Sequence, residues 1–201
     1  MEDAISSGAS SLLSVVAKAR LNKTALYIRF RHGAELLILG SKDIYLQKDC
    51  SLEDLISVPS EALDIVETDA NAPQLSELHN KGRPLSELIW VLTSAWTVEQ
   101  KSDACKKTDV YQLSRWPNLT RLPHRPTAFL VAALLGKQPH SCRIIASKLK
   151  IPIEDVYEFC APALQGGYIE PAGRALECSD ADLIQKPSSS FLSSVLSRLQ
   201  R

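Results

Sequence analysis

The spacing of apolar residues changes along the chain, from an alternating pattern in the first half to a helical pattern in the second. ALYIRFR (25–31) alternates apolar and polar residues as half-buried strands do, and the apolar runs AELLILG (34–40) and DIYLQ (43–47) follow it. HG at 32–33 indicates a hairpin turn. From Thr127 on the pattern predicts three helices: the nearly all-apolar TAFLVAALLGKQ (127–138), SCRIIASKLK (141–150) with Ser141 as its N-cap, and PIEDVYEFCAPAL (152–164) after the Ile-Pro turn. Antiparallel strands in one half and helices in the other predict the α+β class.

Other elements of the first half are predicted from turn and cap residues. A frayed start should lead into a short helix at LLSVVAKA, and a second short helix should begin after Ser51, three residues before the complementary Asp54. ALDIVET predicts a further strand. PLSELIWVLTSAW (84–96) predicts a helix that begins at Pro84, and Trp90 is expected in the core. The apolar stripe of this helix consists of Leu85, Leu88, Ile89, Leu92 and Trp96.

The polar run VEQKSDACKKTD (98–109) is the expected domain boundary, and VYQL after it predicts a short strand. We therefore expect an α+β module at 1–105, a second domain at 106–178, and a linker with an amphipathic C-terminal helix at 179–201. One face of that helix would carry the tail stripe, which consists of Phe191, Leu192, Val195, Leu196 and Leu199. The tail stripe suits folding back on the body or docking into a partner, and folding back is the preferred interpretation.

The net charge of zero conceals a basic block in the middle of the chain. Residues 1–105 carry 10 Lys/Arg and 15 Asp/Glu, or −5, and residues 151–201 carry 4 and 7, or −3. Residues 106–150 carry 9 Lys/Arg and 1 Asp/Glu, or +8. Such a block indicates either an anionic partner or packing beside the protein's own acidic parts, and the sequence leaves both open.

LSRWPNLTRLPHRP (113–126) lies inside the basic block, and we call it the arm. Pro117, Pro123 and Pro126 exclude a long helix and favour extended backbone. We expect the arm to lie along the second domain, with Trp116 and Leu122 packed inward and the arginines outward.

The stretch SCRIIASKLKIPIEDVYEFCAPALQGGYIE resembles the helix-turn-helix and first wing strand of winged-helix domains. The matching features are the small Ala146, Leu149, the Ile-Pro turn, Val156, Leu164 and the closing Gly-Tyr-Ile. The resemblance implies that the second helix of the pair would enter the major groove if the domain read DNA. The segment WPNLTRLPH also resembles one in uncharacterised proteobacterial proteins, which implies no function.

No sequence motif for catalysis is present. GxGxxG, Walker A, GxSxG, HExxH and EF-hand patterns do not occur. The five cysteines form no CxxC pair and the four histidines show no ligand spacing, so neither a metal nor a cofactor is expected and the cysteines are interpreted as partly core residues. We therefore expect a protein that is not an enzyme.

The predicted second helix of the pair is poorly suited to reading bases. It carries Glu154, Asp155 and Glu158, which phosphates would repel, and no Arg, Lys, Asn or Gln before Gln165. The sequence favours a non-catalytic regulatory or adaptor protein whose winged-helix-like domain binds a protein partner. A DNA-binding transcriptional regulator is the first alternative, and a sensor of a small anionic ligand such as a nucleotide is the second. Weak or non-specific nucleic-acid binding fits the basic block.

The candidate anion- or partner-binding residues come from the arm and from the first helix of the pair. They are Arg115, Trp116, Arg121, His124, Arg125, Arg143, Lys148 and Lys150. The chain opens with Glu2 and Asp3 rather than with the basic run of a secretory signal, and its early apolar stretch is shorter than the roughly 20 residues that span a bilayer. We expect a cytoplasmic protein without a membrane span, and the sequence does not predict its oligomeric state.

Overall fold

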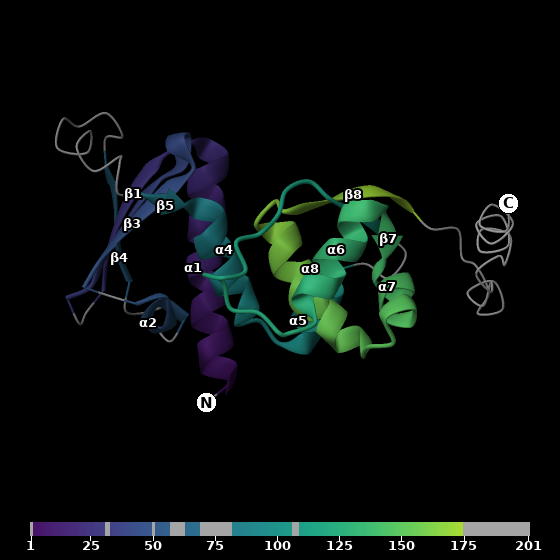
Figure 1. The fold of residues 1–201 in the computed structure, drawn as a ribbon. Coiled ribbons are helices and arrows are strands. Elements are labelled where there is room, and N and C mark those ends of the chain that lie inside the picture. Colours follow the sequence, from purple (N-terminus) through teal and green to yellow (C-terminus); the bar gives the residue numbers. More distant parts are fainter. Residues whose placement is uncertain are drawn as a thin grey trace, which may run out of the picture.

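The computed structural model describes residues 2–30, 33–49, 51–56, 63–68, 82–105 and 109–174, and Figure 1 shows its ribbon. The fold is α+β, with two antiparallel sheets and helices beside each of them. The predicted hairpin turn at 32–33 and the predicted tail at 179–201 with its apolar stripe lie outside the described residues. Within the described ranges, no helix combines the length and the apolar character that crossing a bilayer requires.

The first sheet confirms the strands that the alternating pattern predicts. Its strand order is β4-β1-β2-β3-β5, and all its pairs are antiparallel. The strands are β1 Ala25–Phe30, β2 Glu35–Leu39, β3 Ile44–Lys48, β4 Leu63–Thr68 and β5 Arg83–Pro84. Ile28 and Phe30 of β1 are buried while Arg29 between them is exposed, as the alternation requires.

Helices α1 Glu2–Asn22, α2 Leu52–Ile56 and α4 Leu85–Ser94 lie on one side of this sheet, and the 3-10 turn η1 Gly40–Lys42 links β2 to β3. The prediction of a short first helix was wrong, because α1 runs for 21 residues. The early Ser and Gly residues lower helix propensity, which is why the sequence predicts fraying. Gly40 lies so close to α1 that a Cβ there would overlap the Ala19 carbonyl.

A helix also occupies the segment that was predicted to be a polar domain boundary. Helix α5 Val98–Ala104 begins with a capping box, in which Thr97 accepts from the Gln100 amide and the Gln100 side chain accepts from the Thr97 amide. Its Lys101 is buried, and the helix packs against α8 of the second half. The polar sequence does not reveal that Lys101 is buried, because its ionic partner, Glu158, lies on a helix that is distant in sequence.

The second half contains the three predicted helices and a small sheet. The helices are α6 Ala128–Lys137, α7 Cys142–Leu149 and α8 Ile153–Gln165, and the strands are β6 Asp109–Leu113, β7 His140–Ser141 and β8 Ile169–Arg174. The strand order is β7-β6-β8, so β6, which precedes all three helices in sequence, lies at the centre of the sheet. Whether this unit belongs to the winged-helix superfamily stays a prediction.

Helix α4 contributes to the hydrophobic cores of both halves. Every residue from Leu85 to Thr93 is buried, as expected for a helix enclosed on all sides. Leu88 and its stripe pack toward the first sheet, whereas Trp90 packs in the second core. The prediction that Trp90 is a core residue is confirmed, since none of it is exposed.

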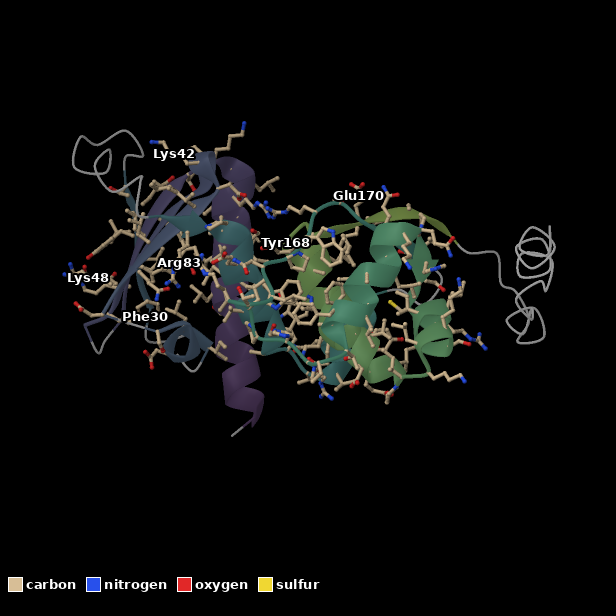
Figure 2. The ribbon with its side chains drawn as sticks, viewed as in Figure 1. Phe30, Lys42, Lys48, Arg83, Tyr168 and Glu170 are labelled. Carbon is tan, nitrogen blue, oxygen red and sulfur yellow. The ribbon has the colours of Figure 1, made fainter. Side chains whose placement is uncertain are left out.

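Tyr168 joins the two halves from the other side. Its hydroxyl lies 3.1 Å from the Ser86 hydroxyl of α4, and its ring meets the Trp90 indole edge-on at 5.5 Å. Figure 2 shows Tyr168 at this junction, where α4 faces the helices of the second half. The two halves are therefore packed against each other through α4.

Candidate functional site

The arm (113–126) crosses the junction between α4 and the second half. Leu119 and Leu122 are each 4% exposed, and the Trp90 indole N–H donates to the Pro123 carbonyl at 2.9 Å. The predicted absence of a long helix and the inward position of Leu122 are confirmed. The backbone is not extended throughout, because the Arg121 and Leu122 amides donate to the Asn118 carbonyl in a turn.

The prediction that Trp116 anchors the core was wrong. Its side chain is 59% exposed. Leu119, Leu122 and Trp90 fill the space beneath the arm, and the indole instead lies over Gly136 near the end of α6, where a Cβ on that glycine would be 3.5 Å from the ring.

The arginines of the arm bind other parts of the chain. Arg115 donates to the Gly166 carbonyl at 2.9 Å and the Gly167 carbonyl at 3.2 Å, and its guanidinium lies 4.3 Å from the centre of the Tyr168 ring. It thus satisfies carbonyls at the C-terminal end of α8, where a cation also complements the helix dipole. Arg121 lies 3.4 Å from the carboxylate of the buried Glu87 on α4.

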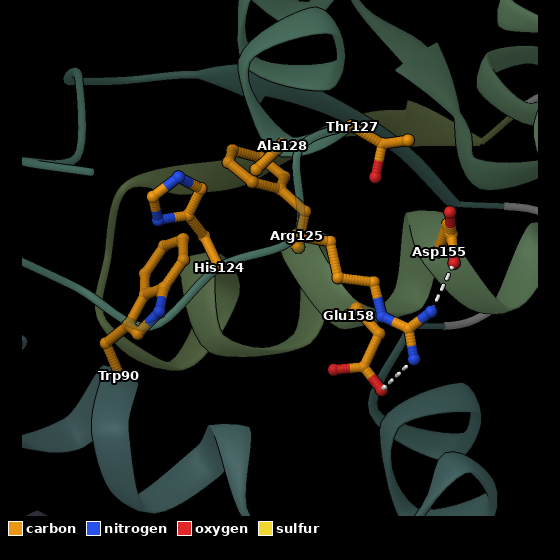
Figure 3. Close-up of a pocket in the computed structure, with 8 residues that line it drawn as sticks. Trp90, His124, Arg125, Thr127, Ala128, Asp155 and Glu158 are labelled. Atoms are coloured by element: carbon orange, nitrogen blue, oxygen red, sulfur yellow. Dashed lines mark hydrogen bonds and ion pairs between the residues drawn. The ribbon is translucent and has the colours of Figure 1, made fainter. Parts of the chain in front are cut away.

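The carboxylates of α8 also have internal partners. Arg125 lies 2.9 Å from Asp155 and 3.9 Å from Glu158, and Figure 3 shows both pairs. The ammonium of Lys101 on α5 lies 2.8 Å from the other oxygen of Glu158 and 2.9 Å from the Ser94 carbonyl. Asp155 and Glu158 are therefore paired within the chain, whereas Glu154 is exposed.

A shallow depression that is open to solvent lies beside these pairs, and Figure 3 shows the residues that line it. It is lined by Trp90, His124, Arg125, Thr127, Ala128, Asp155, Glu158 and Phe159. The depression encloses no space for a ligand, whereas small-molecule pockets usually have volumes of about 300–1,000 Å³. A small anion would also have to compete with Asp155 and Glu158 for Arg125. The depression therefore gives little support to an anion-binding site.

Helix α8 is an interior helix. It packs against α4 and α5 as well as against α6 and α7, and its residues Val156, Phe159 and Cys160 are at most 2% exposed. Along this helix only Glu154 and Gln165 are exposed. A helix enclosed in this way cannot enter a major groove without separating from α4 and α5.

The structure separates the eight candidate binding residues into groups. The arginines of the arm contact α8 or α4, whereas Trp116 and His124 lie beside α6. Arg143 and Lys148 are exposed on α7, and Lys150 is its exposed C-cap. The Lys148 ammonium is 3.2 Å from His140 Nε2. His124 Nδ1 lies 2.8 Å from the Leu122 carbonyl, and its ring meets Phe129 edge-on at 5.3 Å.

An exposed apolar surface lies along α6, and we call it the α6 strip. Phe129 is 50% and Leu130 is 54% exposed, in the first turn of the helix. Ala133 and Gly136 are exposed on the same side at helical spacing, and Trp116 lies over Gly136. The α6 strip consists of Trp116, Phe129, Leu130, Ala133 and Gly136. The sequence missed Phe129 and Leu130 because a helix that is apolar on all sides is normally buried.

Three cysteines that are distant in sequence meet in the second core. Cys105, Cys142 and Cys160 are free thiols with no exposed surface, which confirms that these cysteines are core residues. Hydrogen bonds from Cys105 and Cys160 lower the pKa of the Cys142 thiol to about 5, and the same contacts together with burial raise the pKa of the other two. Within the described part of the chain, no group of three or more His, Cys, Asp or Glu residues is arranged to hold a metal ion.

No protein-family model, no curated protein and no solved structure matches the chain. Function therefore has to be inferred from the residues and contacts of the chain itself.

Proposed function

We propose that this is a non-catalytic regulatory or adaptor protein that binds a protein partner through the α6 strip. The observation that carries the proposal is the exposure of Trp116, Phe129 and Leu130, each at least half exposed, along one helix. Contiguous exposed apolar surface marks interaction sites, and aromatic residues are enriched at the centres of protein interfaces. Gly136 and Ala133 leave room between the large side chains for those of a partner.

The position of α8 supports a protein partner over a DNA target. The helix that a winged-helix domain would place in the major groove is packed against α4 and α5. Its Asp155 and Glu158 form ion pairs with Arg125 and Lys101, so freeing the helix would also break these pairs. In this proposal, the winged-helix-like unit is a scaffold that displays α6.

Weak DNA binding is the second candidate. Arg143, Lys148 and Lys150 are exposed on α7, and lysine and arginine on one exposed helix can contact phosphates without reading sequence. A sensor of a small anion has less support, because Arg115, Arg121 and Arg125 already bind carbonyls or carboxylates of the chain. A cytoplasmic location is part of the proposal.

The test compares partner capture by the full chain and by the variant Phe129→Ser/Leu130→Ser. Both are immobilised and exposed to nuclease-treated and to untreated lysate of the native host, and the retained proteins are quantified by mass spectrometry. The matched control is Leu21→Ser/Val66→Ser, which removes two other exposed apolar side chains (81% and 51% exposed) from the first half. Far-UV circular dichroism checks that all three proteins are folded.

We expect one set of proteins to be retained by the wild type and the control and lost from the α6 variant. Equal retention by all three proteins would contradict the proposed surface. Capture that disappears only when nucleic acid is digested would favour the DNA-binding candidate instead.

A further inference from the structure

The charges and apolar residues of the C-terminal tail complement the surface next to the point where the described chain ends. Strand β8 ends at Arg174, which pairs with Asp109 of β6. The next residue of β6, Val110, pairs with Ser141, the N-cap of α7. The chain therefore leaves the sheet at the end where α7 starts, with β6 between Arg174 and Ser141.

The exposed charged residues of α6, of α7 and of its C-cap are all positive. Arg143, Lys148 and Lys150 lie on α7 and Lys137 lies in the last turn of α6. Asp109 is the only acidic residue between positions 109 and 150. A segment that crosses α7 and α6 would gain from carrying negative charge.

The tail has this charge, followed by apolar residues. Residues 175–190 contain Glu177, Asp180 and Asp182 against a single Lys186. The tail stripe, defined above by its five residues, follows between 191 and 199. Acidic residues therefore come first along the chain after Arg174, and apolar residues come second.

The length of the tail allows its stripe to reach α6. The 16 residues from 175 to 190 span about 50 Å when extended. Helix α6 has ten residues and is about 15 Å long. It packs on β6, the strand that also holds β8, so the whole α6 strip lies within reach of a segment tethered at Arg174.

We infer that the tail stripe docks on the α6 strip of its own chain, with the acidic residues of 175–190 lying over α7. This inference rests on the proposed function, because it names an intramolecular occupant for the surface that a partner would use. The tail then competes with the partner, and a partner binds more tightly to a chain whose tail has been displaced.

The test places the photo-crosslinking amino acid p-benzoylphenylalanine at position 130 of the full chain. Position 21, which is also exposed but belongs to α1, is the matched control. After irradiation, monomer and dimer bands are separated on a denaturing gel and cross-linked peptides are mapped by mass spectrometry. We expect position 130 to cross-link within the monomer to residues 187–201, and position 21 not to do so.

Two full-length variants test the chemistry of docking. Leu192→Asp/Leu196→Asp should abolish the cross-link from position 130, and Asp180→Asn/Asp182→Asn should reduce its yield severalfold. Docking that covers half of the exposed Trp116 indole should also lower its acrylamide quenching about twofold, measured as the difference between the wild type and Trp116→Phe. The Leu192→Asp/Leu196→Asp variant should restore the stronger quenching of Trp116.

Cross-links from position 130 into a second copy, seen as a covalent dimer, would overturn the inference. So would a yield that the Leu192→Asp/Leu196→Asp variant leaves unchanged. The proposed function fails independently: if the tail cross-links as expected but partner capture does not depend on Phe129 and Leu130, only the function is wrong. If capture depends on them and the tail does not cross-link, only the intramolecular occupant is wrong.

Discussion

The guanidinium of Arg125 in the arm lies 2.9 Å from the carboxylate of Asp155 in the first turn of α8. This contact places part of the basic block against the chain's own acidic residues. Arg121 and Glu87 repeat the arrangement at 3.4 Å, between the arm and α4. The positive charge of the arm is thus used largely to hold the arm in place, and further basic residues are exposed on α7, at its C-cap and in the last turn of α6.

DNA binding should be weak and insensitive to sequence. Non-specific complexes at physiological salt typically have dissociation constants of about 10⁻⁴ to 10⁻⁶ M. We expect Arg143→Gln/Lys148→Gln to weaken such binding and Glu154→Gln/Asp155→Asn to strengthen it, because the second pair removes two acids and releases Arg125. Fluorescence anisotropy with labelled genomic fragments measures both changes. A nanomolar complex with one defined site would contradict the proposed function.

Lys101→Met should destabilise the protein by about 2–4 kcal/mol, because it leaves the carboxylate of Glu158 without its closest cation in a largely buried site. Urea unfolding monitored by circular dichroism measures the change. The control is Lys18→Met on the exposed side of α1, which should stay within about 0.5 kcal/mol of the wild type. In the double variant Lys101→Met/Glu158→Leu part of the loss should be recovered, since no unpaired charge remains.

Acid should destabilise the protein through His140. Lysine only donates hydrogen bonds, so the 3.2 Å contact requires His140 Nε2 to accept and the ring to be neutral. Burial and then the charge of Lys148 lower the pKa of His140. A lowered pKa in the folded state gives stability that is complete above the unfolded value, about 6.5, and is lost as pH falls below it.

His140→Gln should therefore flatten the dependence of unfolding free energy on pH below about 6.5. Urea unfolding at a series of pH values, compared with the exposed His124→Gln as a control, measures the slope. An unchanged slope in the His140 variant would show that another group causes the acid sensitivity.

The two cores should unfold together, because α4 contributes to both. Trp90→Ala should cost about 3–5 kcal/mol, as expected for truncation of a buried aromatic residue. The fluorescence of Trp96, which packs against the first core, reports that half in a Trp116→Phe background. We expect its denaturation midpoint to fall although Trp90 lies in the second core, whereas Trp116→Ala should leave stability nearly unchanged. A Trp96 midpoint that does not move would mean that the halves unfold independently.

The elements that the sequence predicted correctly are those with strong local patterns. The alternation around Ile28 and Phe30 predicts β1, and the capping Ser141 and the Ile-Pro turn bound α7 and α8. Local pattern also explains why Trp90 was placed in the core. In each case the residues that determine the structure lie within a few positions of one another.

The errors concern contacts between residues that are far apart in sequence. The polar sequence of α5 gives no sign that Lys101 is buried, because its partner Glu158 lies 57 residues away. Trp116 looked like a core residue because the chain gives no local sign that Leu119 and Trp90 already fill that space. The exposure of Phe129 has the same cause: whether a face of an apolar helix is covered depends on elements that the helix sequence does not contain.

The central position of β6 has a consequence for synthesis on the ribosome. This strand emerges before α6, α7 and α8, yet its second neighbour, β8, emerges after all of them. The nascent second half therefore cannot complete its sheet until Arg174 has left the exit tunnel, and β6 has an unpaired edge until then. A fragment that begins after Leu113 would lack the strand to which both β7 and β8 bind, so the helix pair that resembles a known domain is not a unit that can be excised on its own.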